Sequence, residues 1–395
     1  MLDTFEDFCY LLLNETTKGD NTMLEIQKYL MSHSLEELKE TYGVEAKVYD
    51  DCVLLNYSQI DSPKEEMLVR ECRGLILSKD YKRILCKSFT RFFNYGECQK
   101  TQEGFSFNDA VVYEKVDGSI IRFWHDGVKW NIASRGMAYA EGLTSTAIHT
   151  FHECVMKCFG EGEWEKFCSY LNPNFTYVFE FVSPENRVVK SYGSDYHLYF
   201  LACFDNRFGT EERRQEVIGD TVIELLGEFD NIRHPKVYSL KNYSEIVDFM
   251  SSLDAMDEGF VVYDKKSGIR VKIKNPSYLA IASKRVNGGL TENAIIDMVY
   301  ANETAEYLTY FHEDFHLIEP YKDAYERMMN LIHKVWNDVR FMDTSDAEGR
   351  KMYAGRVKHY PFSGILFSMK DGKEMKDILA RMSDNSKKSM LLKFM

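Results

Sequence analysis

Hydrophobic residues follow a helical period near both ends of the chain and an alternating period between them. An approximate helical stripe is formed by Leu24, Ile26, Tyr29 and Leu30. Ser34 can cap a helix over Leu35–Tyr42, so the pattern predicts a helical segment over residues 1–45. From about Lys47 to Tyr278 short β-rich runs dominate, with a few helical stretches between them.

The β-rich region contains two clear hairpin signals. Asp126-Gly127 separates the strand candidates Ile120–Trp124 and Lys129–Ser134, because glycine accepts the positive φ of a tight turn. Residues 264–268 form a similar turn between two further runs, Glu258–Tyr263 and Ile269–Lys274. Strands are also expected over Val111–Lys115, Thr176–Ser183 and His197–Asp205, and an amphipathic helix over Thr144–Phe159.

After Tyr278 the period becomes helical again, and Asn287-Gly288-Gly289 is the best boundary signal. Helices are expected over Glu292–Tyr300, Tyr321–Phe341 and Gly372–Met382. No internal repeat is found. The sequence therefore predicts an α+β body with antiparallel sheets, followed by a helical C-terminal domain.

Composition narrows the class of protein. The chain has 395 residues, 45% of them apolar and 28% charged, which are ordinary values for a globular protein of two or three domains. No apolar run approaches a membrane span, and the acidic N-terminus does not resemble a signal peptide, so a cytoplasmic location is expected. The nine cysteines include no Cys-x-x-Cys pair, so we expect free thiols, with Cys154 and Cys158 packed rather than ligating zinc.

Charge is unevenly distributed along the chain. The formal net charge of −13 argues against a surface made wholly for nucleic acid. Residues 321–395 nevertheless hold 15 Lys+Arg against 10 Asp+Glu, and residues 350–395 hold 11 against 4. A basic C-terminal region on an acidic body can bind phosphates locally, although a solvated helix surface has the same composition.

The sharpest local feature is the stretch Glu114-Lys115-Val116-Asp117-Gly118-Ser119, which stands where one predicted strand ends and the next begins. Lys115 can act as a nucleophile if its surroundings keep it neutral. Gly118 would let a phosphate approach the backbone closely. A surface turn is the alternative explanation of the same residues.

Two carboxylates stand on or beside predicted strands. Alternation in Val178–Val182 places Glu180 on an apolar face, where a charge is costly without a partner. Glu258 begins another strand. For Glu180 the alternative is an edge strand with one solvent-exposed face. For Glu258 the alternative is a solvated strand end.

Cations gather on one predicted strand face. Arg270, Lys272 and Lys274 alternate with three aliphatic residues, and three cations on one face repel each other unless they meet an anion or water. A polyphosphate is the functional explanation. Upstream, Arg73 and Arg91 stand beside residues that could contact a nucleotide, and ordinary ion pairs are the alternative for each.

Together and in this order, these segments resemble the covalent nucleotidyltransferases and, more narrowly, the RNA ligase 1 family of bacteriophages. The resemblance spans about Asn56 to Tyr278. The matching stretches are Glu71-Cys72-Arg73-Gly74, Arg91-Phe92-Phe93-Asn94, Lys115-Val116-Asp117-Gly118-Ser119, Phe179-Glu180-Phe181-Val182 with Pro184 and Asn186-Arg187, Glu258-Gly259-Phe260-Val261, and Lys272-Ile273-Lys274 followed by Tyr278.

The resemblance implies a fold and a division of labour. Residues 1–284 would form an antiparallel-sheet nucleotidyltransferase body, an ATP-grasp-like ligase domain, with a helical N-terminal segment. Residues 285–395 would form a helical domain that supplies RNA specificity. A DNA ligase or capping enzyme would instead carry an OB-fold after the Lys-Ile-Lys strand.

The resemblance also implies the site. Lys115 would take AMP covalently from ATP. Glu258 would help hold Mg²⁺, with Mn²⁺ as an alternative. Glu180 would contact the ribose, and Lys272 and Lys274 would contact the phosphates. Four further residues would contact the nucleotide, namely Tyr57, Arg73, Arg91 and Phe93. Other positions that match the family pattern are Gly118, Ser134, Arg135 and Tyr278.

Three of these matches depart from the family pattern. The spacing of Tyr57 to Arg73 differs by one residue, and Arg91 and Arg135 stand where the family has lysine. Both arginines keep the positive charge, but a planar guanidinium and a point charge differ in geometry.

The residue types suit the implied chemistry. An ordinary lysine, with a pKa of about 10.4, is almost fully charged at neutral pH. We expect Lys272, Lys274 and a bound metal to lower the pKa of Lys115, because each disfavours another positive charge. AMP would then pass to an RNA 5′-phosphate, and a 3′-hydroxyl would attack that end and release AMP.

The implied partners are RNA ends, a nicked tRNA among them, in the cytoplasm of a host cell if the source is viral. No membrane and no obligate protein partner are expected. A non-catalytic RNA-binding protein on a decayed ligase body is the alternative of another class, and the intact Lys115, Glu180, Glu258, Lys272 and Lys274 argue against it.

Overall fold

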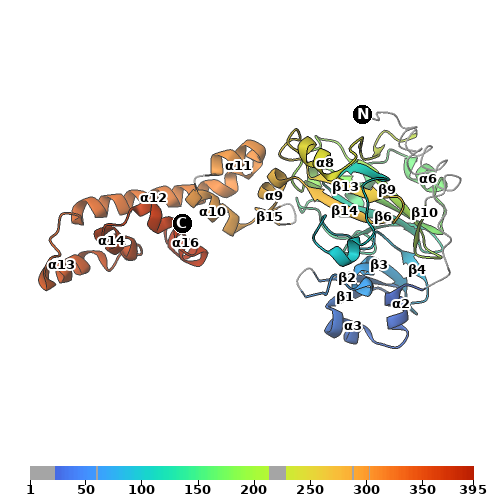
Figure 1. Ribbon diagram of the computed structural model, residues 1–395, viewed down its shortest axis with the longest axis horizontal. Coiled ribbons are helices and arrows are strands. Elements are labelled where there is room, and N and C mark those ends of the chain that lie inside the picture. Colours follow the sequence, from blue (N-terminus) through green and yellow to red (C-terminus); the bar gives the residue numbers. More distant parts are fainter. Residues whose placement is uncertain (1–22, 59–60, 213–227, 287–288, 302) are drawn as a thin grey trace. The chain divides into compact units, whose positions relative to one another are not determined.

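The computed structural model describes residues 23–58, 61–212, 228–286, 289–301 and 303–395 (Figure 1). The chain divides into two compact units, one ending at Ala280 and one beginning at Ile281. Residues 1–22 of the predicted N-terminal helical segment, and Asn287 and Gly288 of the predicted boundary, lie outside the described residues.

A four-stranded antiparallel sheet with short helices opens the first unit. Its strand order is β1-β2-β3-β4. Ser34 caps the second helix through its side chain, as predicted. The prediction of helix up to residue 45 is wrong at its end, because Val44 and Glu45 pair with β2. The elements are α2 (Glu25–Leu30), α3 (Leu35–Tyr42), β1 (Val44–Val48), β2 (Cys52–Tyr57), α4 (Met67–Glu71), β3 (Arg73–Ser78) and β4 (Ile84–Cys86).

A six-stranded sheet forms the centre of the same unit. Its strands follow the order β10-β9-β8-β6-β7, and β11 pairs in parallel with β9. One face packs against an aromatic cluster that includes Phe123, Phe167, Phe179 and Phe200. The strands are β6 (Ser119–His125), β7 (Trp130–Ser134), β8 (Phe175–Val182), β9 (His197–Asp205), β10 (Thr210–Glu212) and β11 (Ile232–Arg233).

The hairpin predicted around Asp126-Gly127 is confirmed, since β6 and β7 pair from His125 and Trp130 onward. The helix predicted over Thr144–Phe159 is mostly wrong, because only α5 (Phe151–Met156) is helical there. The Thr150 side chain caps α5 by accepting a hydrogen bond from the Glu153 N–H, which fixes its start. A further helix, α6 (Glu163–Ser169), follows.

A third sheet has the order β12-β5-β13-β14. It contains the second predicted hairpin, in which β13 and β14 pair over Gly259–Tyr263. The chain passes from this sheet to the central one between Glu114 and Ser119, so the stretch around Lys115 is a crossing between two sheets. The elements are β5 (Ala110–Glu114), β12 (Val237–Tyr238), α8 (Tyr243–Met250), β13 (Gly259–Asp264), β14 (Arg270–Lys274) and the following helix α9 (Pro276–Ala282).

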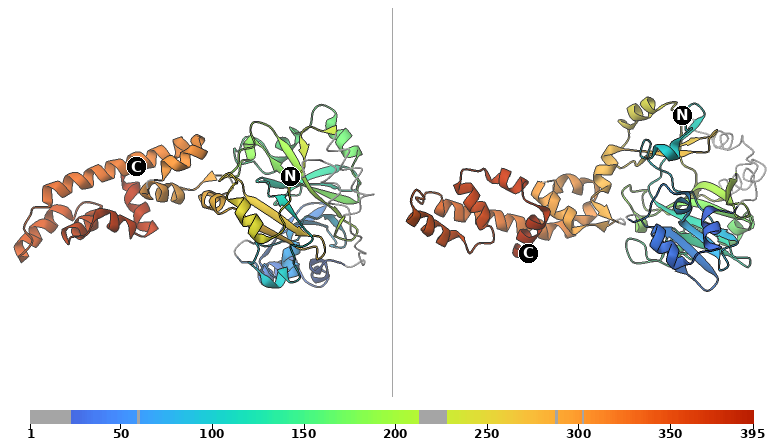
Figure 2. Two further views of the ribbon diagram at one scale, coloured as in Figure 1. Left: turned by 45° about the horizontal axis from the view of Figure 1, so that its top comes forward. Right: turned by 60° about the horizontal axis from the view of Figure 1, so that its bottom comes forward.

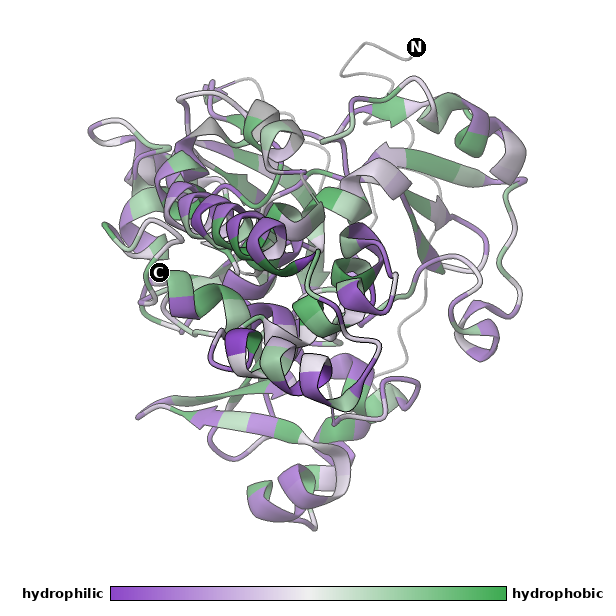
Figure 3. Cartoon of the chain, turned by 90° about the vertical axis from the view of Figure 1, so that its left-hand side faces the viewer, coloured by the Kyte–Doolittle hydropathy of each residue, from purple (hydrophilic) through white to green (hydrophobic). Residues whose placement is uncertain are grey.

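The second unit is helical almost throughout its described residues, apart from the short strands β15 (Arg285–Val286) and β16 (Gly289–Leu290) (Figure 2). The predicted helices are confirmed with different bounds. Apolar positions form stripes along the helices (Figure 3), as on α12, whose buried residues include Met328, Ile332 and Val335. The helices are α10 (Glu292–Ala301), α11 (Thr304–Tyr310), α12 (Phe315–Val339), α13 (Ala347–Val357), α14 (Ser363–Lys370), α15 (Met375–Ala380) and α16 (Asp384–Leu391).

The remaining predictions about composition can be tested on the described residues. The eight cysteines within them are free, and Cys154 and Cys158 pack in the aromatic cluster. None of the described helices is both long enough and apolar enough to cross a bilayer.

Candidate active site

Lys115 lies directly after β5 and is paired with a buried carboxylate. Its N–H donates to the Gly259 carbonyl at 2.9 Å, and its Nζ lies 2.6 Å from Oε2 of Glu258. The other oxygen of Glu258 lies 2.8 Å from Nζ of Lys274. Glu258, only 6% exposed, therefore bridges two lysines.

Two glycines let the strands around Lys115 come close together. A Cβ on Gly118 would stand 2.3 Å from the Phe181 carbonyl oxygen, and Gly259 has φ +120° with the Ile273 carbonyl oxygen equally close. Both distances are far below a normal contact. At Gly118 the neighbour that requires glycine is thus the backbone of β8.

Asp117 holds the crossing in place. Its Oδ2 accepts hydrogen bonds from the Val189 and Lys190 N–H groups at 2.8 and 2.7 Å, and its Oδ1 accepts one from the Tyr278 hydroxyl at 2.7 Å. The Asp117 N–H donates to the Tyr192 hydroxyl at 2.8 Å. The predicted site residue Tyr278 therefore positions the loop that carries Lys115.

A cavity of about 210 Å³ brings several of the predicted residues together. Its other walls are largely apolar and include Phe89, Phe92 and Phe200. Apolar walls with a few converging charges are typical of a small-molecule or cofactor site. The predicted residues that line it are Arg73, Lys115, Glu180, Lys272 and Lys274.

Two groups in this cavity have strongly shifted pKa values. Burial, with the nearby charges of Glu258 and Asp117, raises the pKa of Glu180 to about 7, against the attraction of Lys115 and Arg73. Burial and the cations around it lower the pKa of Lys272 to about 7. Both groups can therefore exchange a proton near neutral pH.

The pKa of Lys115 itself differs from the prediction. Burial lowers it, but the charges of Glu258 and Glu180 outweigh burial, so the pKa lies above its ordinary value. We expected Lys272 and Lys274 to lower the pKa of Lys115. The Glu258 carboxylate raises this pKa more strongly, because it is in direct contact with the Lys115 amine. With the protein's own groups alone, Lys115 is an ammonium ion.

Four other predicted residues form a neighbouring cluster. The Tyr57 ring lies under the guanidinium groups of Arg135 and Arg91, at 4.9 and 5.2 Å, and Nη1 of Arg91 donates to the Tyr57 hydroxyl at 2.9 Å. Arg91 also lies 4.9 Å from the Phe93 ring. These four residues do not line the cavity with Lys115, but the charge of Arg73 acts on Tyr57, Arg135 and Glu180.

A family model described as RNA ligase matches residues 71–278, just over half of the chain. The chain belongs to this RNA ligase family. The match covers the whole cavity and ends at Tyr278, so the resemblance to the phage RNA ligase 1 family is confirmed.

This ligase-family chain covers different shares of the length of two curated relatives. A protein of Autographa californica nuclear polyhedrosis virus, named as a bifunctional polynucleotide kinase/RNA ligase, is 28% identical over an alignment of 330 positions that covers 78% of this chain and 44% of the relative. The chain therefore spans less than half of that protein. An RNA ligase of Rhodothermus phage RM378 is 24% identical over an alignment of 416 positions, gaps included, that covers 88% of this chain and 93% of the relative.

Solved structures of ligases also match. An archaeal ATP-dependent RNA ligase matches with a TM-score of 0.42 and 13% identity, over 86% of this chain and 79% of its own. A Naegleria gruberi RNA ligase with ATP and Mn matches with a TM-score of 0.38 and 14% identity, over 52% and 64%.

One buried arginine of this RNA ligase family member was not predicted from the sequence. Arg122 is fully buried and donates hydrogen bonds to the Gly74 and Ser134 carbonyl oxygens. It thereby ties β3 to β7, next to the predicted Ser134 and Arg135. A cation in the middle of the apolar run Ile120–Trp124 was the available signal.

Lys190, which was also not predicted, forms ion pairs beside Lys115. Nζ of Lys190 lies 2.5 Å from Oδ1 of Asp257 and 3.7 Å from Oε1 of Glu114. Glu114 and Asp257 each precede a residue of the Lys115–Glu258 pair. Lys190 therefore fixes the strand ends from which those two side chains project.

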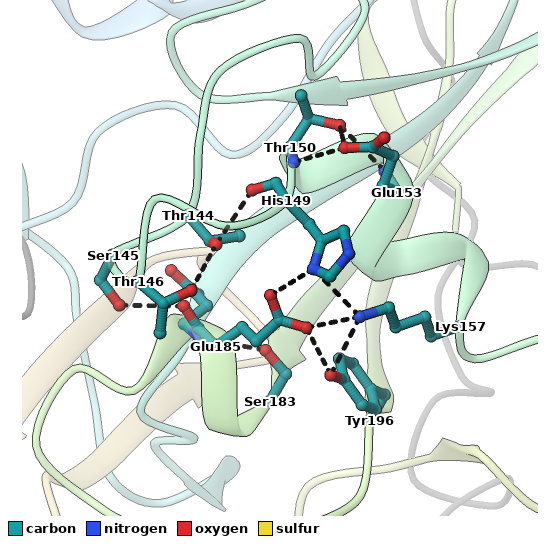
Figure 4. Close-up of polar contacts among 11 residues, drawn as sticks. Thr144, Ser145, Thr146, His149, Thr150, Glu153, Lys157, Ser183, Glu185 and Tyr196 are labelled. Carbon is teal, nitrogen blue, oxygen red and sulfur yellow. Dashed lines mark hydrogen bonds and ion pairs between the residues drawn. The ribbon is translucent and has the colours of Figure 1, made fainter.

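Glu185 is the centre of a third missed network, shown in Figure 4. It accepts hydrogen bonds from Lys157 at 2.5 Å and Tyr196 at 2.6 Å, and it pairs with His149 at 2.7 Å. Burial opposes these bonds, which nevertheless lower the pKa of Glu185 to about 2. Asn186 donates to the Ser119 hydroxyl at 2.9 Å, so the network supports the far end of the Lys115 crossing.

Proposed function

We propose that this protein is an ATP-dependent RNA ligase that joins a 5′-phosphate to a 3′-hydroxyl. The observation that carries the proposal is Lys115, which projects into a cavity with Glu180, Lys272 and Lys274 while its amine contacts Glu258. Membership of the RNA ligase family agrees with this chemistry.

The first step would move AMP onto Lys115. The neutral amine attacks the α-phosphorus of ATP, a nitrogen–phosphorus bond forms, the bond to the β-phosphate breaks, and pyrophosphate leaves. Lys272 and Lys274 stand beside Lys115 and would offset the charge of the phosphates. Glu180 offers a buried carboxyl group to the ribose hydroxyls.

Lys115 must lose a proton before it attacks. In the described residues its amine is held as an ammonium ion by Glu258. An arrangement in which Glu258 turns away from Lys115 would lower the pKa of the amine. Lys274, which contacts the other oxygen of Glu258, would then hold the carboxylate.

The donor set fits a divalent metal ion. Glu180 lines the cavity and Glu258 contacts the amine of Lys115, so two carboxylates lie close to that amine. Hard cations such as Mg²⁺ and Mn²⁺ prefer oxygen ligands. Glu258 would hold the ion. When bound, such an ion supplies positive charge that orients the phosphates of ATP and stabilises the departing pyrophosphate.

The later steps concern RNA. AMP would pass from Lys115 to the RNA 5′-phosphate, giving RNA-adenylate, and the 3′-hydroxyl would displace AMP. A nicked tRNA in RNA repair is the specific substrate that we propose, with residues 285–395 contributing to its selection. The cytoplasm is the proposed location, without an obligate protein partner.

The test is an end-joining assay with defined RNA. We expect a nicked, structured RNA with 5′-phosphate and 3′-hydroxyl ends to be sealed when ATP and Mg²⁺ are present. RNA with a 5′-hydroxyl should remain open. Sealing of a DNA nick at an equal rate, or no sealing of any RNA, would contradict the proposed function.

A further inference from the structure

A second cavity, of about 240 Å³, adjoins the nucleotide cavity. Four residues line both cavities: Phe89, Phe92, Glu211 and Arg270. Lys115, Glu180 and Lys272 do not line the second one. The mechanism proposed above therefore leaves the second cavity unused.

Lys87 is the most unusual residue in the wall of the second cavity. This lysine is only 4% exposed, and its Nζ donates to the Ser88 carbonyl at 3.2 Å and to the Thr90 hydroxyl at 3.3 Å. Both partners are neutral. No carboxylate among the described residues forms an ion pair with Lys87. A buried charge without a close counter-charge destabilises a folded protein, so we expect the Lys87 ammonium group to lower the stability of this one.

The acidic residues nearest to Lys87 are engaged elsewhere. Glu71 accepts a hydrogen bond from the Ile26 N–H at 3.0 Å, and Glu211 forms a two-pronged ion pair with Arg270 at 2.7 and 2.5 Å. Their charges act on Lys87 only at longer range, and burial still lowers the pKa of Lys87.

Arg70 adds a second cation to the same wall. Its Nε donates to the Arg91 carbonyl at 2.9 Å, and its guanidinium lies 5.8 Å from the Phe93 ring. Within the described part of the chain it forms no ion pair. Among the described residues that line this cavity, Arg70, Lys87 and Arg270 thus stand against one carboxylate, that of Glu211.

Aromatic rings complete the wall, since Phe89, Phe92, Phe93 and Phe204 all line the cavity. Cations beside aromatic rings are the chemistry of single-stranded nucleic acid sites, where cations meet the phosphates and rings meet the bases. The phosphates of ATP are already provided for by Lys272 and Lys274 in the other cavity.

We propose that the second cavity binds a backbone phosphate of the RNA substrate, with Lys87 and Arg70 as its cationic partners. This inference rests on the proposed RNA ligase function and adds a substrate-binding site to it. It also explains why a costly buried lysine stands beside the nucleotide cavity.

The test separates RNA binding from nucleotide chemistry. Lys87→Met keeps the aliphatic stem and removes the charge, Arg70→Gln removes the second charge, and Lys79→Met removes an exposed charge as a matched control. For each protein, fluorescence anisotropy would give the affinity for a 5′-phosphorylated oligoribonucleotide over a series of salt concentrations. Lysyl–AMP formation and the melting temperature would be measured on the same samples.

We expect Lys87→Met and Arg70→Gln each to weaken RNA binding about tenfold, the size of one charged hydrogen bond. The slope of log affinity against log salt should fall by about 0.7, the value for one phosphate of a single strand. Lysyl–AMP formation should stay within about twofold of wild type. Removing an uncompensated buried charge should leave the melting temperature of Lys87→Met unchanged or raise it.

Three results would overturn the site. RNA affinity equal to that of Lys79→Met would show that no phosphate binds there. A KM for ATP that rises as much as RNA affinity falls would assign the cavity to ATP phosphate or pyrophosphate. A lowered melting temperature with unchanged RNA affinity, in Lys87→Met or in the polar variant Lys87→Gln, would make Lys87 structural.

A failure of the proposed function can be distinguished from a failure of the second-cavity proposal. A wild-type protein that forms no lysyl–AMP and joins no RNA counts against the ligase assignment. A wild type that joins RNA, together with variants of undiminished RNA affinity, counts against the second cavity alone.

Discussion

At the proposed nucleophile, burial and charge act in opposite directions. Burial favours the neutral amine of Lys115, whereas the Glu258 carboxylate 2.6 Å away favours the ammonium ion and prevails. The side chain that we expect to hold the metal also restrains the nucleophile. Glu258 would therefore link the arrival of metal and ATP to the release of the Lys115 amine.

This link predicts a pH effect. Because the reactive form of Lys115 is the neutral amine, the rate of lysyl–AMP formation should rise with pH through the pKa of Lys115. Glu258→Gln removes the charge that raises this pKa, so the midpoint of the rate profile should move to lower pH even where the maximal rate falls. A midpoint that stays in place, or moves to higher pH, would contradict the role of Glu258.

Glu180 predicts an effect on stability. Its pKa is about 7 in the folded protein against 4.5 ordinarily, so its contribution to stability is present below pH 4.5 and lost as pH rises through 7. Glu180→Gln, which stays neutral, should gain melting temperature relative to wild type between pH 5 and 8. A difference that is constant over this range would show that Glu180 is not shifted.

At the scale of elements, the strands were more predictable than the helix between them. Alternation identified both hairpins, together with the Asp126-Gly127 turn in one and the turn at residues 264–268 in the other. Alternation on β14 also placed Lys272 and Lys274 on one face, and both line the cavity. The helix expected over Thr144–Phe159 is shorter in the structure, where only α5 forms. Thr150 caps the start of α5, and His149 before it belongs to the Glu185 network.

Contacts distant in sequence could not be predicted. Asp117 depends on the backbone of Val189 and Lys190, more than seventy positions away, and no local pattern announces such a pairing. Arg122 is similar, because its partners are carbonyl groups of two other strands.

The close approach of the crossing to β8 predicts the effect of Gly118→Ala. The added Cβ would stand 2.3 Å from the Phe181 carbonyl oxygen, so the backbone around Lys115 must shift. We expect a loss of about 1–3 kcal/mol in the free energy of unfolding and a large loss of lysyl–AMP formation. Gly355→Ala on α13, where a Cβ meets nothing within 4 Å, is the control and should be fully active. Equal behaviour of the two variants would refute the steric argument.

At the scale of the whole molecule, the two units differ in charge and in their proposed tasks. The residues that line the cavity containing Lys115 all belong to the first unit, while the basic residues concentrate near the C-terminal end of the second. The first unit ends at Ala280 and the second begins at Ile281, soon after the change of period at Tyr278, whereas the domain boundary predicted from the sequence lies between residues 284 and 285. The sequence pattern carries no information on which RNA each unit contacts.

This division predicts a separation of effects. Lys373, Lys376 and Lys393 are exposed, and replacing all three by Gln should weaken binding of structured RNA and flatten its salt dependence. Lysyl–AMP formation, measured without RNA, should not change. The same replacement of the exposed Lys28, Lys39 and Lys79 in the first unit serves as the charge-matched control. If both triple variants lose RNA affinity equally, residues 350–395 have no special part in RNA binding.

The most direct test of the central claim is to map the covalent intermediate. The protein would be incubated with α-labelled ATP and Mg²⁺, denatured, digested, and analysed for the labelled peptide. We expect one AMP on Nζ of Lys115, none in Lys115→Ala, and normal labelling of the control Lys79→Ala. Label that persists in Lys115→Ala, or that maps to another residue, would exclude Lys115 as the nucleophile.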